Sequence, residues 1–330
     1  MSVFVIAEIG SVHDGNFASA KKLIALAKKC GADAVKFQTH IASAETLRDA
    51  PMPPYFKGEP RYEYFERTGF SLAQWKKLRA YADKVGIEFM SSPFSIEAVD
   101  LLEQVGVKRY KIPSGEITNI PFLKRVGSTR KPVILSSGMS SWDEIDEAVT
   151  VFRKTKNKLT ILQCTTEYPC PPEHVGLNIL TEMRKRYRIP VGISDHTLTP
   201  FASLAAVTLG AEIVEKHLTS SRTLYGSDAK HSLEPEEFRL MVDGIRAIEK
   251  MLRSPVKKSA KPYAHMKEIF EKSVVTVKHI PRGKTIDASM LGCKKPGTGI
   301  PAREFDSLIG KKAARDLPPD TLLTKSDFQS

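Results

Sequence analysis

Two histidines that follow short apolar runs could together bind a divalent metal. The run at 191–194 leads into Asp195 and His196, and the run at 213–217 ends in His217. A neutral imidazole nitrogen is a common ligand of divalent metals, and two such ligands leave coordination positions open for water or substrate. The spacing of 21 residues is a weak metal signal by itself. The signal becomes stronger if the two runs are neighbouring strands that end at the same edge of a sheet.

Donors suited to an anion lie at the ends of the other apolar runs. Ammonium and hydroxyl groups are what a bound phosphate or carboxylate requires. Carboxylic acids occur there too, and Glu8, Glu116 and Glu215 are candidates for proton transfer or for supporting the metal ligands. The candidate anion-binding residues are Lys36, Lys111, Ser92, Ser114, Ser136 and Ser194.

The first 252 residues have the pattern of a parallel barrel. Eight short apolar runs, each followed by a helical pattern, predict a (β/α)8 TIM barrel, an α/β fold in which the chemistry lies at the carboxyl ends of the strands. A doubly wound sheet is the alternative, but no Gly-x-Gly-x-x-Gly motif opens a helix. The predicted strands span 4–8, 34–38, 88–92, 109–112, 133–136, 159–164, 191–194 and 213–217. The predicted helices include 19–29, 71–85, 96–105, 142–154, 201–209 and 234–252.

Beyond residue 252 the sequence changes in character. Residues 253–269 are basic, contain two prolines and lack periodicity, which predicts a linker. Residues 270–330 combine short β-like runs with proline- and glycine-rich turns, which predicts a small β-rich domain. A domain of about 60 residues has a marginal core. We therefore expect it to pack against another surface.

The composition narrows the class of function. The 330 residues carry a formal net charge of +12, but the basic residues are spread along the chain and no nucleic-acid-binding motif occurs. We expect no nucleic-acid partner and a positive field that attracts small phosphorylated or carboxylated molecules. The N-terminus does not have the pattern of a signal peptide, and no apolar stretch of about 18 residues occurs. Four cysteines without a CxxC pair indicate reduced thiols. A cytoplasmic protein without a membrane partner is expected.

Several motifs lie at the ends of the predicted strands, among them Gly192-Ile193-Ser194-Asp195-His196-Thr197 and Glu215-Lys216-His217. Together they resemble the sialic acid synthase family. The resemblance implies condensation of phosphoenolpyruvate with an N-acylated hexose, such as N-acetylmannosamine, to a nine-carbon 2-keto acid, with phosphate released by C–O cleavage. The last 60 residues look like the antifreeze-like (SAF) domain of that family, through the run that begins at Lys294 and ends at Ile300. The barrel motifs are Ala7-Glu8-Ile9-Gly10 with His13, Val35-Lys36-Phe37-Gln38-Thr39, Lys111-Ile112-Pro113-Ser114-Gly115-Glu116, Gly192-Ile193-Ser194-Asp195-His196-Thr197 and Glu215-Lys216-His217.

The resemblance also implies roles for single residues. It implies that His196 and His217 hold a divalent metal, Mn²⁺ or Mg²⁺, and that Glu8, Lys36 and Glu116 are catalytic. It further implies a homodimer in which the small domain of one protomer caps the barrel of the other. The implied phosphoenolpyruvate contacts are Lys36, Ser92, Lys111, Ser114, Ser136, Thr166 and Ser194. The implied sugar contacts are Glu8, Gln38, Tyr168, Asp228 and Lys295.

Two positions depart from the family pattern. Thr166 stands where members with sialic acid specificity often have an asparagine, and Lys295 stands where an arginine commonly meets the N-acyl group. Lysine lacks the bidentate fork of arginine. Legionaminic and pseudaminic acid synthases and spore-coat polysaccharide synthases of the same family therefore stay open as alternatives.

The sequence leaves open two further classes of function and the role of the connection at 39–71. A synthase of the 3-deoxy-octulosonate type is a second enzyme class, although such enzymes lack the C-terminal domain. A catalytically silent sugar- or ice-binding protein is the alternative outside enzymes, and it would not need the lysine and histidine constellation. The connection at 39–71, with its proline- and aromatic-rich run at 51–56, is expected either to cover the barrel mouth or to pack as a surface loop.

Overall fold

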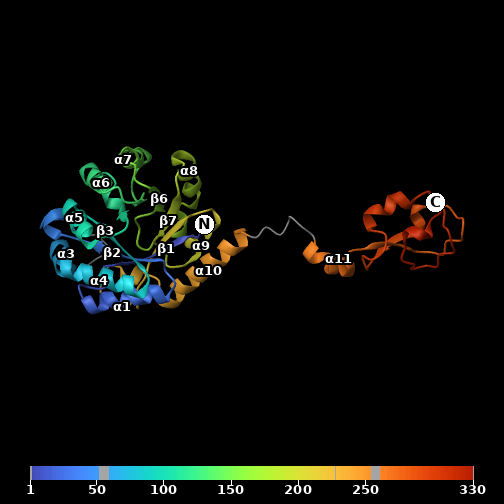
Figure 1. The fold of residues 1–330 in the computed structure, drawn as a ribbon, viewed down its shortest axis with the longest axis horizontal. Coiled ribbons are helices and arrows are strands. Elements are labelled where there is room, and N and C mark those ends of the chain that lie inside the picture. Colours follow the sequence, from blue (N-terminus) through green and yellow to red (C-terminus); the bar gives the residue numbers. More distant parts are fainter. Residues whose placement is uncertain (1, 52–58, 227, 254–260, 330) are drawn as a thin grey trace. The chain divides into compact units, whose positions relative to one another are not determined.

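The computed structural model describes residues 2–51, 59–226, 228–253 and 261–329. It divides into two compact units, Met1–Ser254 and Pro255–Ser330, both drawn in Figure 1. Most of the run predicted at 51–56 lies outside the described residues. In the part of the chain that is described, no helix is both long and apolar enough to cross a membrane.

Eight parallel strands form the first unit's sheet. Their order is β3-β2-β1-β8-β7-β6-β5-β4, and β3 also lies beside β4, so the sheet closes as a barrel. The Arg109 guanidinium bridges this closure to the Glu88 carboxylate, at 2.6 and 3.0 Å. These strands match the predicted ones to within two residues, and the TIM barrel is confirmed. They are β1 (Phe4–Gly10), β2 (Ala34–Thr39), β3 (Glu88–Pro93), β4 (Tyr110–Ile112), β5 (Val133–Ser136), β6 (Leu159–Cys164), β7 (Val191–Asp195) and β8 (Ile213–His217).

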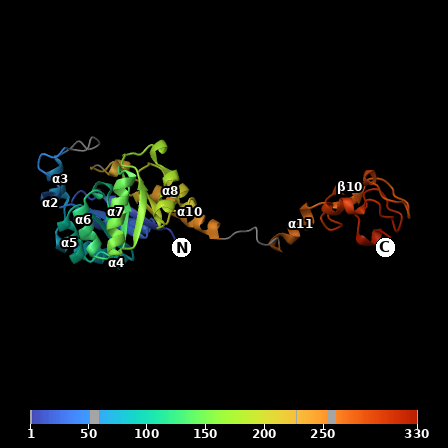
Figure 2. The same cartoon turned by 90° about the horizontal axis from the view of Figure 1, so that it is seen from above.

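Helices surround the strands, as Figures 1 and 2 show. Side-chain caps fix where several of them begin: Ser71 forms a capping box with Gln74, and Ser141 forms one with Glu144. The helices are α1 (Phe17–Lys29), α2 (Ala42–Glu45), α3 (Arg61–Thr68), α4 (Leu72–Val85), α5 (Ile96–Val105), α6 (Ile120–Ser128), α7 (Trp142–Thr155), α8 (Leu177–Tyr187), α9 (Phe201–Thr208) and α10 (Pro235–Arg253). Of these, α2 and α3 belong to the 39–71 connection between β2 and α4.

The barrel interior is built in layers because side chains alternate along each strand. The lower layer is apolar and fully buried: Ile6, Ala34, Met90, Ile134, Leu162 and Ile213. Two residues further along the same strands come Glu8, Lys36, Ser92, Ser136, Cys164 and Glu215. The strand β7 contributes Gly192 and then Ser194 in the same way. A Cβ at Gly192 would lie 2.3 Å from the carbonyl oxygen of Ile213, so only glycine fits there.

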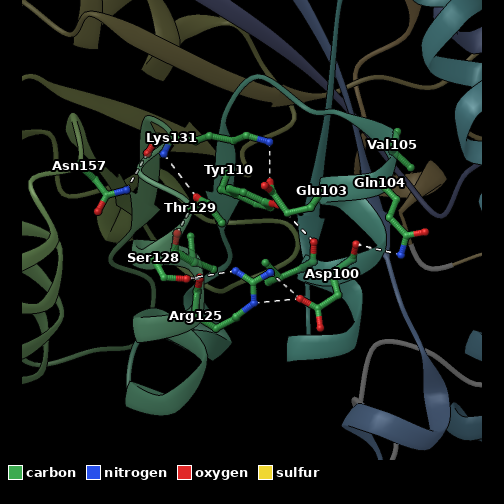
Figure 3. A network of polar contacts seen from close by, with 12 residues as sticks. Asp100, Glu103, Gln104, Val105, Tyr110, Arg125, Ser128, Thr129, Lys131 and Asn157 are labelled. Atoms are coloured by element: carbon green, nitrogen blue, oxygen red, sulfur yellow. Dashed lines mark hydrogen bonds and ion pairs between the residues drawn. The ribbon is translucent and has the colours of Figure 1, made fainter.

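A polar network outside the barrel holds β4 against its neighbouring helices (Figure 3). The buried Tyr110 donates its hydroxyl hydrogen to Glu103 of α5 at 2.7 Å. Arg125 of α6 reaches Asp100 of α5 at 2.6 and 2.9 Å. Lys131 also contacts the Glu103 carboxylate. These bonds fix the short strand β4, whose next residue after Tyr110 points into the barrel.

The second unit has its own small core. Two antiparallel strands, β9 (Ser273–Thr276) and β10 (Leu291–Lys294), pair from Leu291 with Thr276 to Lys294 with Ser273. The core comprises Val274, Ile280, Ile286, Met290, Leu291, Ile300, Leu308, Ala313, Leu317 and Leu323. The stretch predicted as a linker contains the short, exposed helix α11 (Ala264–Phe270), which an ion pair between Lys267 and Glu271 supports.

Candidate active site at the carboxyl end of the barrel

A cavity at the carboxyl ends of the strands brings together most of the predicted site residues. Their side chains follow directly above the apolar layer of the barrel. Because side chains alternate between the two faces of a strand, those on the same face as the apolar layer point toward the barrel axis. The predicted residues that line the cavity are Glu8, Lys36, Gln38, Ser92, Lys111, Ser114, Ser136, Tyr168, Ser194, His196 and His217. Pro113, Cys164 and Glu215 line it as well.

Two buried ammonium groups and two buried carboxylates occupy the cavity floor. Lys36 Nζ lies 2.9 Å from Glu8 Oε2, 3.5 Å from Glu215 Oε1 and 3.0 Å from the Ser92 hydroxyl. Lys111 Nζ lies 3.3 Å from the same Glu215 oxygen, to which Ser194 donates at 3.1 Å. Glu215 is therefore the shared counter-ion of both lysines.

The pKa shifts follow from these pairings. Burial alone would lower the pKa of Lys36, but the carboxylates of Glu215 and Glu8 outweigh it and the pKa is raised. Burial lowers the pKa of Lys111, and its single carboxylate neighbour, Glu215, does not compensate. Burial opposes ionisation of Glu215, yet Lys111 and Lys36 hold its pKa well below the usual range. An anionic ligand beside Lys111 would supply the negative charge that this ammonium group lacks.

The two histidines lie at neighbouring strand ends with their ring centroids 5.6 Å apart. His196 Nδ1 lies 2.7 Å from the Thr165 carbonyl oxygen, to which it donates. Its Nε2 is then an acceptor, 3.2 Å from the Tyr168 hydroxyl. Burial, and next the adjacent His217, lowers the pKa of His196 to about 3, so the ring is neutral. Neutral imidazole is the form that a metal requires.

A buried ring nitrogen that has no hydrogen-bond partner in the described part of the chain supports metal binding by these histidines. His217 Nδ1 is buried and accepts or donates no hydrogen bond within the described residues. In the same part of the chain, no group of three or more His, Cys, Asp or Glu side chains is arranged to hold a metal. A cation here would thus take two protein ligands, with its other positions left to water and substrate.

Four predicted residues do not line the cavity. Thr166 bonds to the Ser114 hydroxyl at 3.1 Å, and Asp228 accepts from the Ser11 backbone and hydroxyl at 2.8 and 2.9 Å. Glu116 follows β4 and accepts from Asn119, and burial raises its pKa. Lys295 belongs to the second unit, where its ammonium lies 5.0 Å from the Phe270 ring centroid.

The residue patterns gave Glu215 too small a role, gave His40 none and did not point to Glu45. Glu215 was only a general candidate for proton transfer, although its position two residues after Ile213 marks it as inward-facing. His40 stood out only as a polar residue that follows the second strand, without a role, and Glu45 did not stand out at all. They lie in the 39–71 connection, beyond the strand pattern from which the other residues were found.

Similarity to known proteins extends over nearly the whole chain. The NeuB family model matches residues 23–257 and the SAF domain model matches residues 271–329. The chain is 39% identical to the N,N'-diacetyllegionaminic acid synthase of Campylobacter jejuni, over 97% of this chain and 98% of that protein. It is 35% identical to the N-acetylneuraminate-9-phosphate synthase of Mus musculus, over 99% and 93%. The crystal structure of N-acetylneuraminic acid synthetase from Leptospira borgpetersenii matches with a TM-score of 0.71 and 32% identity, over 81% of this chain and 90% of that chain.

A TIM barrel with this cavity, followed by a SAF domain, defines a synthase of sugar acids. The chain belongs to the NeuB family. The resemblance that the motifs indicated is thereby confirmed. The relatives differ in the sugar acid for which they are named, so the family settles the class of enzyme and leaves its acceptor to be determined.

Proposed function

We propose that the protein condenses phosphoenolpyruvate with an N-acylated hexose to give a nine-carbon 2-keto acid and inorganic phosphate. The observation that carries this proposal is the cavity itself, which two buried ammonium groups and two histidines line together. The relatives support the same class of reaction through their names, which are those of sialic and legionaminic acid synthases.

The lysines and hydroxyl groups would hold phosphoenolpyruvate. Lys36 and Lys111 are the charged donors, and Ser92, Ser136 and Ser194 lie beside them at strand ends. The hydroxyl of Ser136 is buried and has no hydrogen-bond partner within the described residues, so it is available to a ligand. Hydrogen bonds from an ammonium group to an anionic ligand are stronger than hydrogen bonds between neutral groups.

The charge balance of the cavity favours a cation beside the substrate. Lys36 and Lys111 are opposed by Glu8 and Glu215, so the floor has little net positive charge for a ligand that carries both a phosphate and a carboxylate. A divalent metal, Mn²⁺ or Mg²⁺, held by His196 and His217 would add positive charge and supply Lewis-acid polarisation of the sugar aldehyde.

The reaction can be written with all atoms accounted for. The C3 carbon of phosphoenolpyruvate forms a bond to the aldehyde carbon, and the aldehyde oxygen gains a proton to become a hydroxyl group. Water adds at C2 and gives up both protons as the C2–O bond to phosphate breaks to leave the ketone: one replaces the proton donated to the aldehyde oxygen, and the other leaves with the phosphate. Holding both substrates in one cavity is the main contribution of the protein.

Two carboxyl groups are candidates for the proton transfers. Glu8 is engaged by the ammonium of Lys36 and the amide of Gln38, which limits its freedom to exchange a proton in this arrangement. Burial and the nearby charge of Glu45 raise the pKa of Glu116, which favours it as the proton donor. We assign Glu116 to proton delivery and Glu8 to orienting the lysine and the sugar.

The direct test is phosphate release from phosphoenolpyruvate over a panel of acceptors. N-acetylmannosamine, its 6-phosphate and a 2,4-diacetamido hexose cover the acceptors that the relatives' names suggest. We expect metal-dependent release with one member of the panel, and its loss in His196→Ala and His217→Ala variants. Full turnover in the presence of chelator, or in either variant, would contradict the metal assignment.

A further inference from the structure

A chain of polar contacts runs from the cavity into the 39–71 connection. Glu8 Oε1 lies 2.9 Å from Gln38 Nε2, and Gln38 Oε1 lies 3.1 Å from His40 Nε2. On the other side of the ring, His40 Nδ1 lies 2.6 Å from Glu45 Oε1 of α2. Three consecutive contacts therefore join a cavity carboxylate to a carboxylate outside the barrel strands.

The hydrogen-bond directions along this chain are determined by its ends. Glu8 accepts from the Gln38 amide nitrogen through one carboxyl oxygen and contacts Lys36 through the other. The amide oxygen of Gln38 then faces His40, whose Nε2 must donate. Glu45 Oε1 contacts the other ring nitrogen at 2.6 Å and anchors the ring from that side. The amide of Gln38 is thus fixed in one of its two possible orientations.

Aromatic side chains hold the His40 ring in this position. The ring stacks on Phe65 of α3 with centroids 3.8 Å apart and planes 4° apart. On its other face lies Phe94, with centroids 4.1 Å apart. The side chains of His40 and Glu45 are only 8% and 5% exposed. Neither ring rotation nor competition from water can readily break the contact to Gln38.

We propose that Glu45 and His40 are positioning residues that lock Gln38 as a hydrogen-bond donor toward the acceptor sugar, an inference that rests on the proposed function. Gln38 donates one N–H to Glu8, and its amide oxygen accepts from His40. Its second N–H is therefore available to donate to a ligand. The sugar group at this point must accept a hydrogen bond, as a hydroxyl or carbonyl oxygen does. The segment that contains α2 and α3 thereby sets acceptor specificity from outside the strands.

The His40→Phe variant tests this inference because phenylalanine keeps the aromatic stack and removes both ring nitrogens, and with them the contacts to Gln38 and Glu45. We expect the KM for the sugar to rise roughly 3- to 10-fold, as for the loss of one hydrogen bond. The KM for phosphoenolpyruvate and the melting temperature should stay near wild type. Glu45→Gln should shift the sugar KM in the same direction, and His279→Phe, in the second unit, serves as the matched control. An unchanged sugar KM, or an equal rise in both KM values, overturns the proposal.

Chemical rescue separates donation from shape. His40→Gly opens a gap between Phe65 and Phe94, and added imidazole should lower the sugar KM again. 1-Methylimidazole, whose neutral form has no N–H to donate, should rescue less, and equal rescue by the two compounds would overturn the inference.

A crystal structure of His40→Phe gives a readout independent of activity. The Gln38 side chain should lose its single position, because only its contact to Glu8 remains, whereas an unchanged side-chain position contradicts the proposal. If the wild type turns over no acyl hexose, the proposed function fails, and this structural readout still decides whether His40 positions Gln38.

Discussion

At the scale of single residues, the cavity depends on buried charges that compensate one another. Lys36 contacts both carboxylates and the Ser92 hydroxyl. Its ammonium is held charged by its neighbours and is ready to bind an anion. A substitution there should affect binding of phosphoenolpyruvate and catalysis together.

The Lys36→Met variant should raise the KM for phosphoenolpyruvate and lower kcat. A lost charged hydrogen bond of about 1.5–3 kcal/mol corresponds to roughly 10- to 150-fold in kcat/KM. Steady-state kinetics measure this, with the exposed Lys76→Met as the control. Unaltered phosphoenolpyruvate kinetics would mean that Lys36 is structural.

A second residue should make stability depend on pH. His13 is buried, stacks on Phe70 and accepts from the Gly15 backbone, and burial lowers its pKa to about 4. Because this is below the unfolded value of about 6.5, the unfolded chain binds the proton first as the pH falls. The contribution of neutral His13 to the free energy of unfolding is fully present above about pH 6.5 and is lost as the pH falls toward 4. At pH 5 the loss is about 2 kcal/mol.

Urea unfolding of wild type and His13→Asn at pH 7.5 and pH 5 measures this effect. Both tryptophans, Trp75 and Trp142, lie in the first unit, so their fluorescence reports on that unit alone. The variant should lose less stability than wild type between the two pH values. Equal losses would show that another group is responsible.

At the scale of elements, strands β7 and β8 carry a second buried pair on the face opposite the cavity. Lys216 Nζ lies 2.9 Å from Asp195 Oδ1, and both side chains are almost completely buried. Lys216 also donates to the Thr197 carbonyl, and Asp195 accepts from Ser203 at 2.7 Å. Each member of the pair directly precedes one of the two histidines, so the pair ties together the strand ends that present them.

Removal of one member of the Lys216–Asp195 pair should lower the free energy of unfolding. Lys216→Met leaves a buried carboxylate uncompensated, which typically costs about 3–5 kcal/mol. The double variant Lys216→Met/Asp195→Leu should recover part of this loss, because neither charge then remains. Urea unfolding followed by tryptophan fluorescence checks both. A double variant with the full sum of two single losses would refute the pairing.

The elements also show what the sequence could predict. Apolar runs and side-chain alternation were enough to locate all eight strands, and with them Glu8, Lys36 and His217 at their ends. The contact of His40 with Glu45 could not be predicted in this way. It depends on how a non-repeating connection folds against Phe65 and Phe94, and no periodicity encodes that packing. The helix α11 was missed for a related reason, since its seven residues are too short for a helical pattern.

At the scale of the whole molecule, we propose that the protein acts as a homodimer in which the small unit serves the partner's cavity. Truncation after Arg253 should then raise the sugar KM far more than the phosphoenolpyruvate KM. Mixing Lys295→Ala with His196→Ala protomers should restore activity in part, because one site of a mixed dimer is intact. Light scattering checks the oligomeric state. A fully active monomer, or a truncated barrel with normal sugar kinetics, would refute the proposal.

The central claim, condensation with loss of phosphate from C2, is tested most directly by isotope labelling. Phosphoenolpyruvate carrying oxygen-18 in the C2–O–P bridge is incubated with the protein, metal and the acceptor found active in the panel. The account predicts that the label leaves in inorganic phosphate and that the new keto oxygen comes from water. Label retained in the keto acid, or no phosphate released with any acyl hexose, would contradict it.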